Sequence, residues 1–222
     1  KNLTPRLLVR EGDAVKAGTP VFADKFSPEI IFASPVSGVV SEVVRGEKRK
    51  LLEIRIKTDK QIEYIKYDLP KVEDLSAEKI IEALKKSGLW VCLKQRPYGI
   101  IPNPNVEPKA IFVSGFSSVP AAPDYDYALK DEFDNIQLAI NALNKLTKGG
   151  VHMGLRRISA NSTPLHKLKN VYFHVFDGPH PADNVGVQIH HISPVNKGEV
   201  VWTVDLPLLA AIGKFFSKGI YD

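Results

Sequence analysis

Hydrophobic residues in the first quarter of the chain occur in short runs separated by glycine-containing turns. The runs lie at residues 7–10, 15, 21–22, 30–33, 39–44 and 51–56. Short apolar stretches between such turns are typical of a small β-sandwich or barrel. The sequence therefore predicts a compact β domain, which we assign to residues 1–62.

The pattern changes between residues 63 and 76. Residues 63–75 are polar, are interrupted by Pro70 and predict a linker or one more edge strand. Ser76 then offers a helix N-cap, apolar residues follow at helical spacing, and Gly88 ends the helix. A second domain is therefore expected to begin at residue 76.

Beyond Gly88, short apolar runs alternate with segments of helical spacing. Strands are predicted at residues 89–93, 110–114, 150–153, 171–176 and 199–204, and helices at residues 132–146, 182–192 and 206–216. This alternation is typical of a parallel or mixed sheet covered by helices. We assign residues 76–222 to an α/β domain. Because the chain starts at Lys1 without methionine and stops at Asp222 without a polar tail, we expect it to be an internal piece of a longer protein, truncated within this domain.

Composition narrows the function classes. The formal net charge is +5, but the basic residues are spread along the chain, so no nucleic-acid partner is predicted. The densest basic cluster, residues 45–50, is interpreted as a solvated hairpin turn; the alternative is a face toward anionic lipid or an acidic partner protein. The single cysteine, Cys92, excludes an intramolecular disulfide and suits a reducing compartment. No apolar stretch approaches the roughly 20 residues of a membrane helix, so a cytoplasmic, peripheral protein is expected.

Nucleotide-binding motifs are absent from the predicted α/β domain. Neither the glycine-rich dinucleotide turn nor the P-loop pattern occurs, and Pro97 stands where a phosphate-binding backbone amide would be needed. Lys94 and Arg96 could hold an anion, but a solvent-facing pair is the simpler interpretation. A soluble NAD(P) or flavin enzyme is therefore the least favoured functional class.

Two loops carry candidate functional residues. The first follows the predicted strand 110–114, and its prolines stiffen a segment that presents Asp124, Tyr125 and Asp126. These carboxylates suit acid/base chemistry or a metal, or, more simply, a solvated turn cap. The second loop interrupts an apolar strand with Gly178, Pro179, His180 and Pro181. Ligands of open α/β sheets bind at the carboxyl ends of strands, so this second loop is the main candidate.

Four of the six histidines lie near the second loop: His174, His180, His190 and His191. No cysteine or carboxylate accompanies them at a recognised metal-ligand spacing, so no metal site is predicted. His190 and His191 are helical neighbours about 100° apart, so we expect one to face the core and the other solvent. No serine, cysteine and histidine arrangement supports nucleophilic catalysis, and no catalytic residue is predicted.

The β domain resembles the biotinyl/lipoyl carrier fold, the barrel-sandwich hybrid. The resemblance rests on Glu-Gly-Asp at 11–13, Gly18, Pro20 and the Ser-Pro turn that begins at Ser34. Carrier domains present a modified lysine at a tight hairpin, and Lys25 is the only candidate. Because the interval from Lys25 to the following Ser-Pro turn is longer than the carrier pattern, we predict neither lipoylation nor biotinylation. Mass spectrometry of protein from its native host tests that prediction.

Three separated blocks resemble the A-type subunit of the sodium-translocating NADH:quinone reductases, the NQR family. They are residues 9–49 of the β domain, residues 117–127 with 143–147, and residues 178–190. The first block is also similar to the C-type subunit of the related Rnf complex, whereas the His-Pro loop favours the NQR family. Asp183, Val187 and Gln188 depart from the family pattern. The family also resembles the flavin-binding subunit of respiratory complex I, which implies a Rossmann-like α/β domain without the glycine-rich nucleotide loop.

The resemblance implies a peripheral subunit on the cytoplasmic face of the bacterial inner membrane. The complex would transfer electrons from NADH to ubiquinone while it exports Na⁺, and it would use FAD, FMN and a 2Fe-2S centre on membrane and flavin-bearing partner subunits. This chain would bind no cofactor itself and would not be catalytic alone. It would contribute to the quinone-reduction step or to assembly. The alternative is a non-catalytic docking module of an Rnf-type electron-transport complex.

The A-type subunits have been linked to quinone, so the resemblance also implies candidate residues for quinone binding or for a subunit interface. They are Gly178, Pro179, His180, Pro181, His190, Asp124 and Tyr125.

Overall fold

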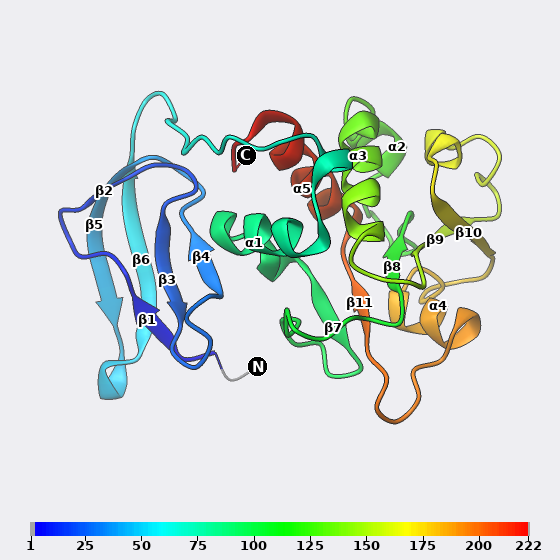
Figure 1. Ribbon diagram of the computed structural model, residues 1–222, viewed down its shortest axis with the longest axis horizontal. Coiled ribbons are helices and arrows are strands. Elements are labelled where there is room, and N and C mark those ends of the chain that lie inside the picture. Colours follow the sequence, from blue (N-terminus) through cyan, green and yellow to red (C-terminus); the bar gives the residue numbers. More distant parts are fainter. Residues whose placement is uncertain (1–2, 222) are drawn as a thin grey trace.

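The computed structural model describes residues 3–221, so residues 1–2 of the predicted first domain and residue 222 of the second lie outside the described part. Figure 1 shows a region built mainly of strands, in blue and cyan, beside a larger region of mixed helices and strands. This arrangement confirms the predicted fold class of a small β domain followed by an α/β domain. The domain boundaries at residues 62 and 76 stay a prediction.

The β domain is a sandwich of two antiparallel three-stranded sheets, in the orders β1-β3-β4 and β2-β5-β6. Its small core contains Val9, Val15, Val21 and Val40. The strands are β1 (Pro5–Leu7), β2 (Ala14–Val15), β3 (Pro20–Asp24), β4 (Ile31–Ala33), β5 (Gly38–Arg45) and β6 (Leu51–Thr58). The basic cluster at residues 45–50 lies in the turn from β5 to β6, which confirms its interpretation as a hairpin turn.

The α/β domain is built on a five-stranded mixed sheet of order β10-β9-β8-β11-β7. The first four of these strands are parallel, and β7 pairs with β11 in the antiparallel direction. The strands are β7 (Lys94–Arg96), β8 (Ile111–Ser114), β9 (Val151–Arg156), β10 (Val171–Phe176) and β11 (Val201–Thr203). The prediction of a parallel or mixed sheet is thus confirmed.

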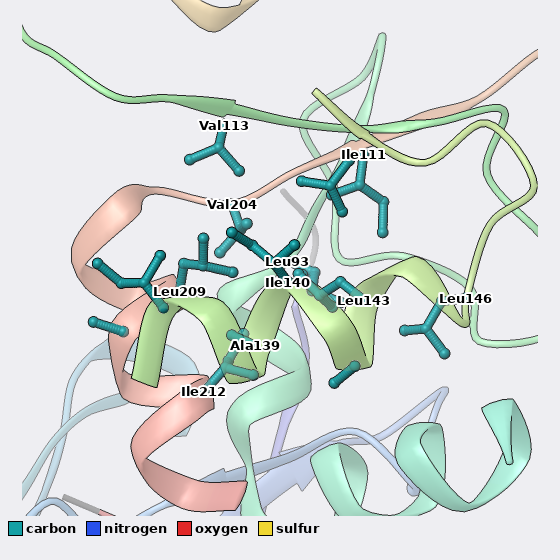
Figure 2. Close-up of a cluster of buried hydrophobic side chains, with 14 of the residues drawn as sticks. Leu93, Ile111, Val113, Ala139, Ile140, Leu143, Leu146, Val204, Leu209 and Ile212 are labelled. Carbon is teal, nitrogen blue, oxygen red and sulfur yellow. The ribbon is translucent and has the colours of Figure 1, made fainter. Parts of the chain in front are cut away.

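Helices cover both faces of this sheet. The largest cluster of buried side chains includes residues of α1 (Ala77–Ser87), α3 (Phe133–Asn144) and α5 (Leu206–Lys218) on one face (Figure 2). On the other face, α4 (Val185–Ile192) places Ile189 against Phe112 and Val201. Helix α1 begins at the predicted cap, where the Ser76 hydroxyl accepts a hydrogen bond from the Lys79 amide, and it ends at Gly88.

One predicted strand is wrong. Residues 89–93 do not form a strand, because Leu89–Cys92 is a 3₁₀ helix and β7 begins only at Lys94. Gly88 adopts a left-handed backbone conformation that ends α1 and starts the 3₁₀ helix. The indole nitrogen of the buried Trp90 donates a hydrogen bond of 2.9 Å to the Pro102 carbonyl. A short apolar run shows that a segment is buried but does not reveal its period.

Among residues 3–221, no helix has the length and apolar character needed to cross a membrane.

Candidate functional site

The parallel strands β8 and β11 are neighbours, but their connections run in opposite directions. The chain proceeds from β8 to β9 and β10 on one side, and then returns through α4 to β11 on the other side of β8. Open α/β sheets bind ligands at such a switch point, outside the carboxyl ends of the strands. The two predicted loops both lie at this edge, since one follows β8 and the other follows β10.

The loop after β8 starts with a close approach between strands. The Gly115 amide donates to the Gly154 carbonyl at 2.8 Å, and a Cβ on Gly115 would lie 2.9 Å from that same oxygen. The chain then continues through the short helix α2 (Tyr125–Ala128), and α3 begins only at Phe133. The helix N-terminus that binds pyrophosphate in dinucleotide folds therefore does not follow β8 directly.

Asp183 joins the two loops. The Ser117 hydroxyl donates to Asp183 Oδ2 at 3.0 Å, and the Ser118 hydroxyl donates to Asp183 Oδ1. The Asp183 side chain is only 13% exposed. Burial favours the protonated carboxyl, but the hydrogen bonds from Ser118 and Ser117 outweigh it and hold the pKa of Asp183 below its usual value. An ionised carboxylate thus fixes residues 117–118 against the His-Pro loop.

His180 lies at the exposed rim of this network. Its Nδ1 is 3.2 Å from both the Ser118 hydroxyl and Asp183 Oδ1, and its side chain is 54% exposed. A nucleophilic triad needs the serine and the carboxylate on opposite ring nitrogens. Because both partners meet the same nitrogen, the arrangement orients the imidazole and does not activate Ser118. We call Ser117, Ser118, His180 and Asp183, with the adjoining cavity, the carboxyl-edge site.

Gln188 supports this site from α4, although no sequence motif pointed to it. The buried side-chain amide donates to the Ser114 hydroxyl and to the Ala182 carbonyl, both at 3.1 Å. A Cβ on Gly154 would collide with the Gln188 side chain, so that glycine is needed for the contact. The helical spacing of the sequence could have revealed this burial. Gln188 lies three positions after Val185 and next to Ile189, which places it on the apolar side of the predicted helix.

A cavity of about 380 Å³ opens at the ends of β8 and β9. Asp124 and Tyr125 line it, as does Ser117 of the carboxyl-edge site. Asp124 caps α2 by accepting a hydrogen bond from the Asp126 amide at 2.9 Å, and Asp126 accepts one from the Thr163 hydroxyl at 2.6 Å. The Asp124 and Asp126 carboxylates therefore stabilise turns. This agrees with the simpler interpretation of these residues, a turn cap, and not with acid/base chemistry or a metal site. The other residues of the wall include Phe116, Val119, Ala122, Leu155, Arg156 and Ile158.

Tyr125 is partly buried and lies near two carboxylates. Burial raises the pKa of the Tyr125 phenol, and Asp205 and Asp183 raise it further. Asp205 follows β11 and forms an ion pair of 2.8 Å with Lys94, whose side chain is exposed as expected, whereas Arg96 is half-buried. Cys92 lies near Asp205. Burial is the main cause that raises the pKa of the Cys92 thiol to about 11. A thiol with this pKa stays protonated at neutral pH and is a poor nucleophile.

His190 does not join the carboxyl-edge site. Both His190 and His191 are exposed on α4, so the expectation that one of them faces the core is wrong. The buried side of this short helix is filled by Gln188 and Ile189, and the next two positions both turn away from the sheet.

A histidine pair lies elsewhere, on β9 and β10. His152 Nδ1 is 2.9 Å from His174 Nε2, and burial lowers the pKa of both rings. In residues 3–221, no cluster of three or more His, Cys, Asp or Glu side chains is arranged to hold a metal ion.

This pair predicts that stability falls below about pH 6.5. The unfolded chain takes up protons near the ordinary histidine pKa, whereas the folded pair resists protonation until lower pH. The urea midpoint should therefore drop between pH 7.5 and pH 5.5, and the double substitution His152→Gln/His174→Gln should flatten that slope. His166→Gln serves as the control, because this ring contacts Phe173 and not the pair. An unchanged slope in the double variant would refute the assignment.

Comparisons with known proteins agree on one family. Residues 1–59 match the model of the NqrA N-terminal barrel-sandwich hybrid domain, and residues 75–221 match that of the NqrA second alpha/beta domain. The A-type subunit of the Na(+)-translocating NADH-quinone reductase of Yersinia pseudotuberculosis serotype O:1b is 36% identical over 98% of this chain and 48% of its own length. The same subunit of Neisseria meningitidis serogroup A is also 36% identical, with the same coverage. The chain spans about half the length of the curated relatives it matches.

Among solved structures, an NAD⁺-reducing [NiFe]-hydrogenase in the air-oxidized state is similar with a TM-score of 0.41 and 12% identity, over 68% of this chain and 32% of the other. The two family models and the identities to the reductase subunits decide the assignment. The chain belongs to the NqrA family, the A-type subunits of the Na⁺-translocating NADH-quinone reductases.

Proposed function

We propose that this chain forms part of a peripheral subunit of a sodium-pumping respiratory complex that transfers electrons from NADH to ubiquinone. Within that complex, we propose that the carboxyl-edge site binds the quinone ring and contributes to its reduction. The observation that supports this role is the cavity lined by the loop after β8, whose Ser117 hydroxyl joins it to the ionised Asp183 and, through that carboxylate, to the His180 imidazole.

The chemistry of the cavity suits a quinone. A quinone ring is flat and apolar, carries two carbonyl oxygens that accept hydrogen bonds, and takes up two protons with two electrons. Phe116, Val119 and Leu155 supply apolar wall, and the Arg156 guanidinium on the same wall is a hydrogen-bond donor for a quinone carbonyl. The cavity volume of about 380 Å³ lies within the range of small-molecule sites. In this proposal, the electrons come from flavin-bearing partner subunits.

His180 would be the proton donor at the rim. Asp183 Oδ1 lies 3.2 Å from His180 Nδ1 and orients the ring, so that its other nitrogen would pass a proton to the quinone. In this proposal, the quinone would approach the exposed part of the His180 ring. Gly178, Pro179 and Pro181 would shape that entrance, and His190 would contact a partner subunit from the outer face of α4.

Filling the cavity tests the quinone role. Ala122→Phe places a bulky ring in the cavity and should lower NADH-driven quinone reduction by about tenfold in the purified complex. A tenfold loss corresponds to about 1.4 kcal/mol, which is within the usual free-energy cost of overpacking. Reduction of an artificial acceptor by the flavin subunits should stay unchanged. Val106→Phe is the matched control, because Val106 is partly exposed in the loop that precedes β8.

If Ala122→Phe leaves quinone reduction at the level of Val106→Phe, the chain has an assembly role and the cavity is not a quinone site. Co-purification of the partner subunits separates a loss of assembly from a loss of activity. A thermal shift of the isolated protein with NADH or FMN would instead favour an independent nucleotide or flavin enzyme.

A further inference from the structure

The histidine pair on β9 and β10 is independent of the carboxyl-edge site. His152 and His174 come from adjacent parallel strands whose register fixes their backbones, with His152 opposite Tyr172 and His174 opposite Gly154. Both side chains are partly exposed on the α4 face of the sheet. We infer that His152 and His174 form a two-histidine site for a divalent late-transition-metal ion, for which Cu²⁺ is the best-suited probe.

The spacing of the two nitrogens fits neighbouring metal ligands. His152 Nδ1 and His174 Nε2 are 2.9 Å apart. Two imidazole nitrogens about 2.0 Å from one ion and at right angles to each other are separated by about 2.8 Å, as in the tetragonal geometry of Cu²⁺. Tetrahedral coordination of Zn²⁺ would need about 3.3 Å. The separation of the nitrogens therefore changes little when the ion enters, and the His174 ring turns so that its Nε2 lone pair meets the ion on the Nδ1 lone pair of His152.

The protonation state also suits metal binding. His152 Nε2 lies 3.1 Å from the Gly149 carbonyl, which can only accept, so this nitrogen carries the proton and Nδ1 keeps its lone pair. A ligating histidine commonly donates its other N–H to a carbonyl in this way. Burial lowers the pKa of both rings, so both are neutral at physiological pH. In the metal-free pair, His174 Nε2 therefore donates its proton to His152 Nδ1. To bind the ion through Nε2, His174 needs only to carry its proton on Nδ1 instead.

Neighbouring rings hold the first ligand in position. Phe112 stacks on His152 with a centroid distance of 4.9 Å, and Tyr172 tilts against it at 5.0 Å. Rotamers fixed by such contacts lower the cost of ordering a metal site. Two protein ligands leave the other positions of the ion to water, so the site would bind with modest affinity. The ion would link β9 to β10, the edge strand of the sheet.

Cu²⁺ titration of the full-length protein tests the inference. Wild-type protein should bind one Cu²⁺ that His152→Gln and His174→Gln each weaken by at least about tenfold, and its low-temperature EPR spectrum should show two coordinated imidazole nitrogens. The same ion should raise the melting temperature of the wild type but not of His152→Gln/His174→Gln. His166→Gln and the exposed pair variant His190→Gln/His191→Gln are controls for surface histidines.

The inference is overturned if the two single variants bind Cu²⁺ as tightly as the wild type, or if His190→Gln/His191→Gln removes the two-nitrogen spectrum instead. Circular dichroism of each variant shows whether it is folded. His152→Asn supplies a second substitution of the first ligand if His152→Gln fails to fold.

Discussion

Gly213→Ala is expected to destabilise the protein by about 3 kcal/mol, at the upper end of the usual cost of overpacking a core. Gly213 lies in α5, where that helix crosses α3, and a Cβ at this position would lie 1.7 Å from the Asn135 carbonyl oxygen. Neighbouring backbone cannot yield as a flexible side chain would, so the two helices must move apart. Chemical unfolding followed by circular dichroism measures the loss.

The matched control is Gly186→Ala in α4. A Cβ there meets only the Asn184 side-chain oxygen at 3.1 Å. Alanine also favours a helix over glycine by up to about 1 kcal/mol. We therefore expect Gly186→Ala to leave the free energy of unfolding unchanged or slightly higher. Equal losses in the two variants would contradict the close crossing of α3 and α5.

Asp183→Ala should have the second large effect, on both stability and activity. The substitution leaves the Ser117 and Ser118 hydroxyls without their buried acceptor, which costs about 1–3 kcal/mol. It also releases His180, so quinone reduction by the complex should fall by about tenfold or more, as for a misplaced proton donor. Unfolding of the isolated protein and steady-state kinetics of the complex measure the two effects separately.

Asp177→Ala is the comparison for Asp183→Ala. Asp177 begins the same loop, but its carboxylate is exposed and pairs with Arg157 at 3.2 Å. An exposed ion pair of this kind contributes little to the free energy of unfolding.

The two variants should also differ in the pH dependence of their stability. Because the pKa of Asp183 is lowered in the folded protein, this carboxylate contributes stability above the unfolded pKa of about 3.9, and that contribution is lost as the pH falls further. Asp183→Ala should lack this acid-dependent part, whereas Asp177→Ala should retain it.

The sequence predicted the fold well wherever periodicity was long and bounded by caps. Helix α1 lies between the cap Ser76 and Gly88 as expected, and β10 occupies the predicted residues 171–176. The strand predicted at residues 89–93 was wrong, because five consecutive apolar residues are compatible with a buried strand and with a 3₁₀ helix. What decided between them was the Trp90 hydrogen bond to the distant Pro102 carbonyl, a tertiary contact.

The candidate site was predictable only in part. The rule that ligands bind at carboxyl ends of strands selected the loop with His180, stiffening prolines selected the loop with Asp124 and Tyr125, and the family resemblance linked these residues to quinone. The sequence did not reveal that Ser118 meets Asp183, because residues 118 and 183 approach only when the chain returns from β10 to α4. It also did not reveal the contact between His152 and His174, which depends on the register of two strands 20 residues apart.

The central claim, that quinone binds at the carboxyl edge of this chain, is tested most directly by photoaffinity labelling. The intact complex is labelled with a quinone that carries a photoreactive group on its ring, and labelled peptides are identified by mass spectrometry. We predict labels within residues 115–126 or 178–183, competed by unlabelled ubiquinone and lost in Ala122→Phe. Labels confined to other subunits, with none in those two segments, would contradict the claim.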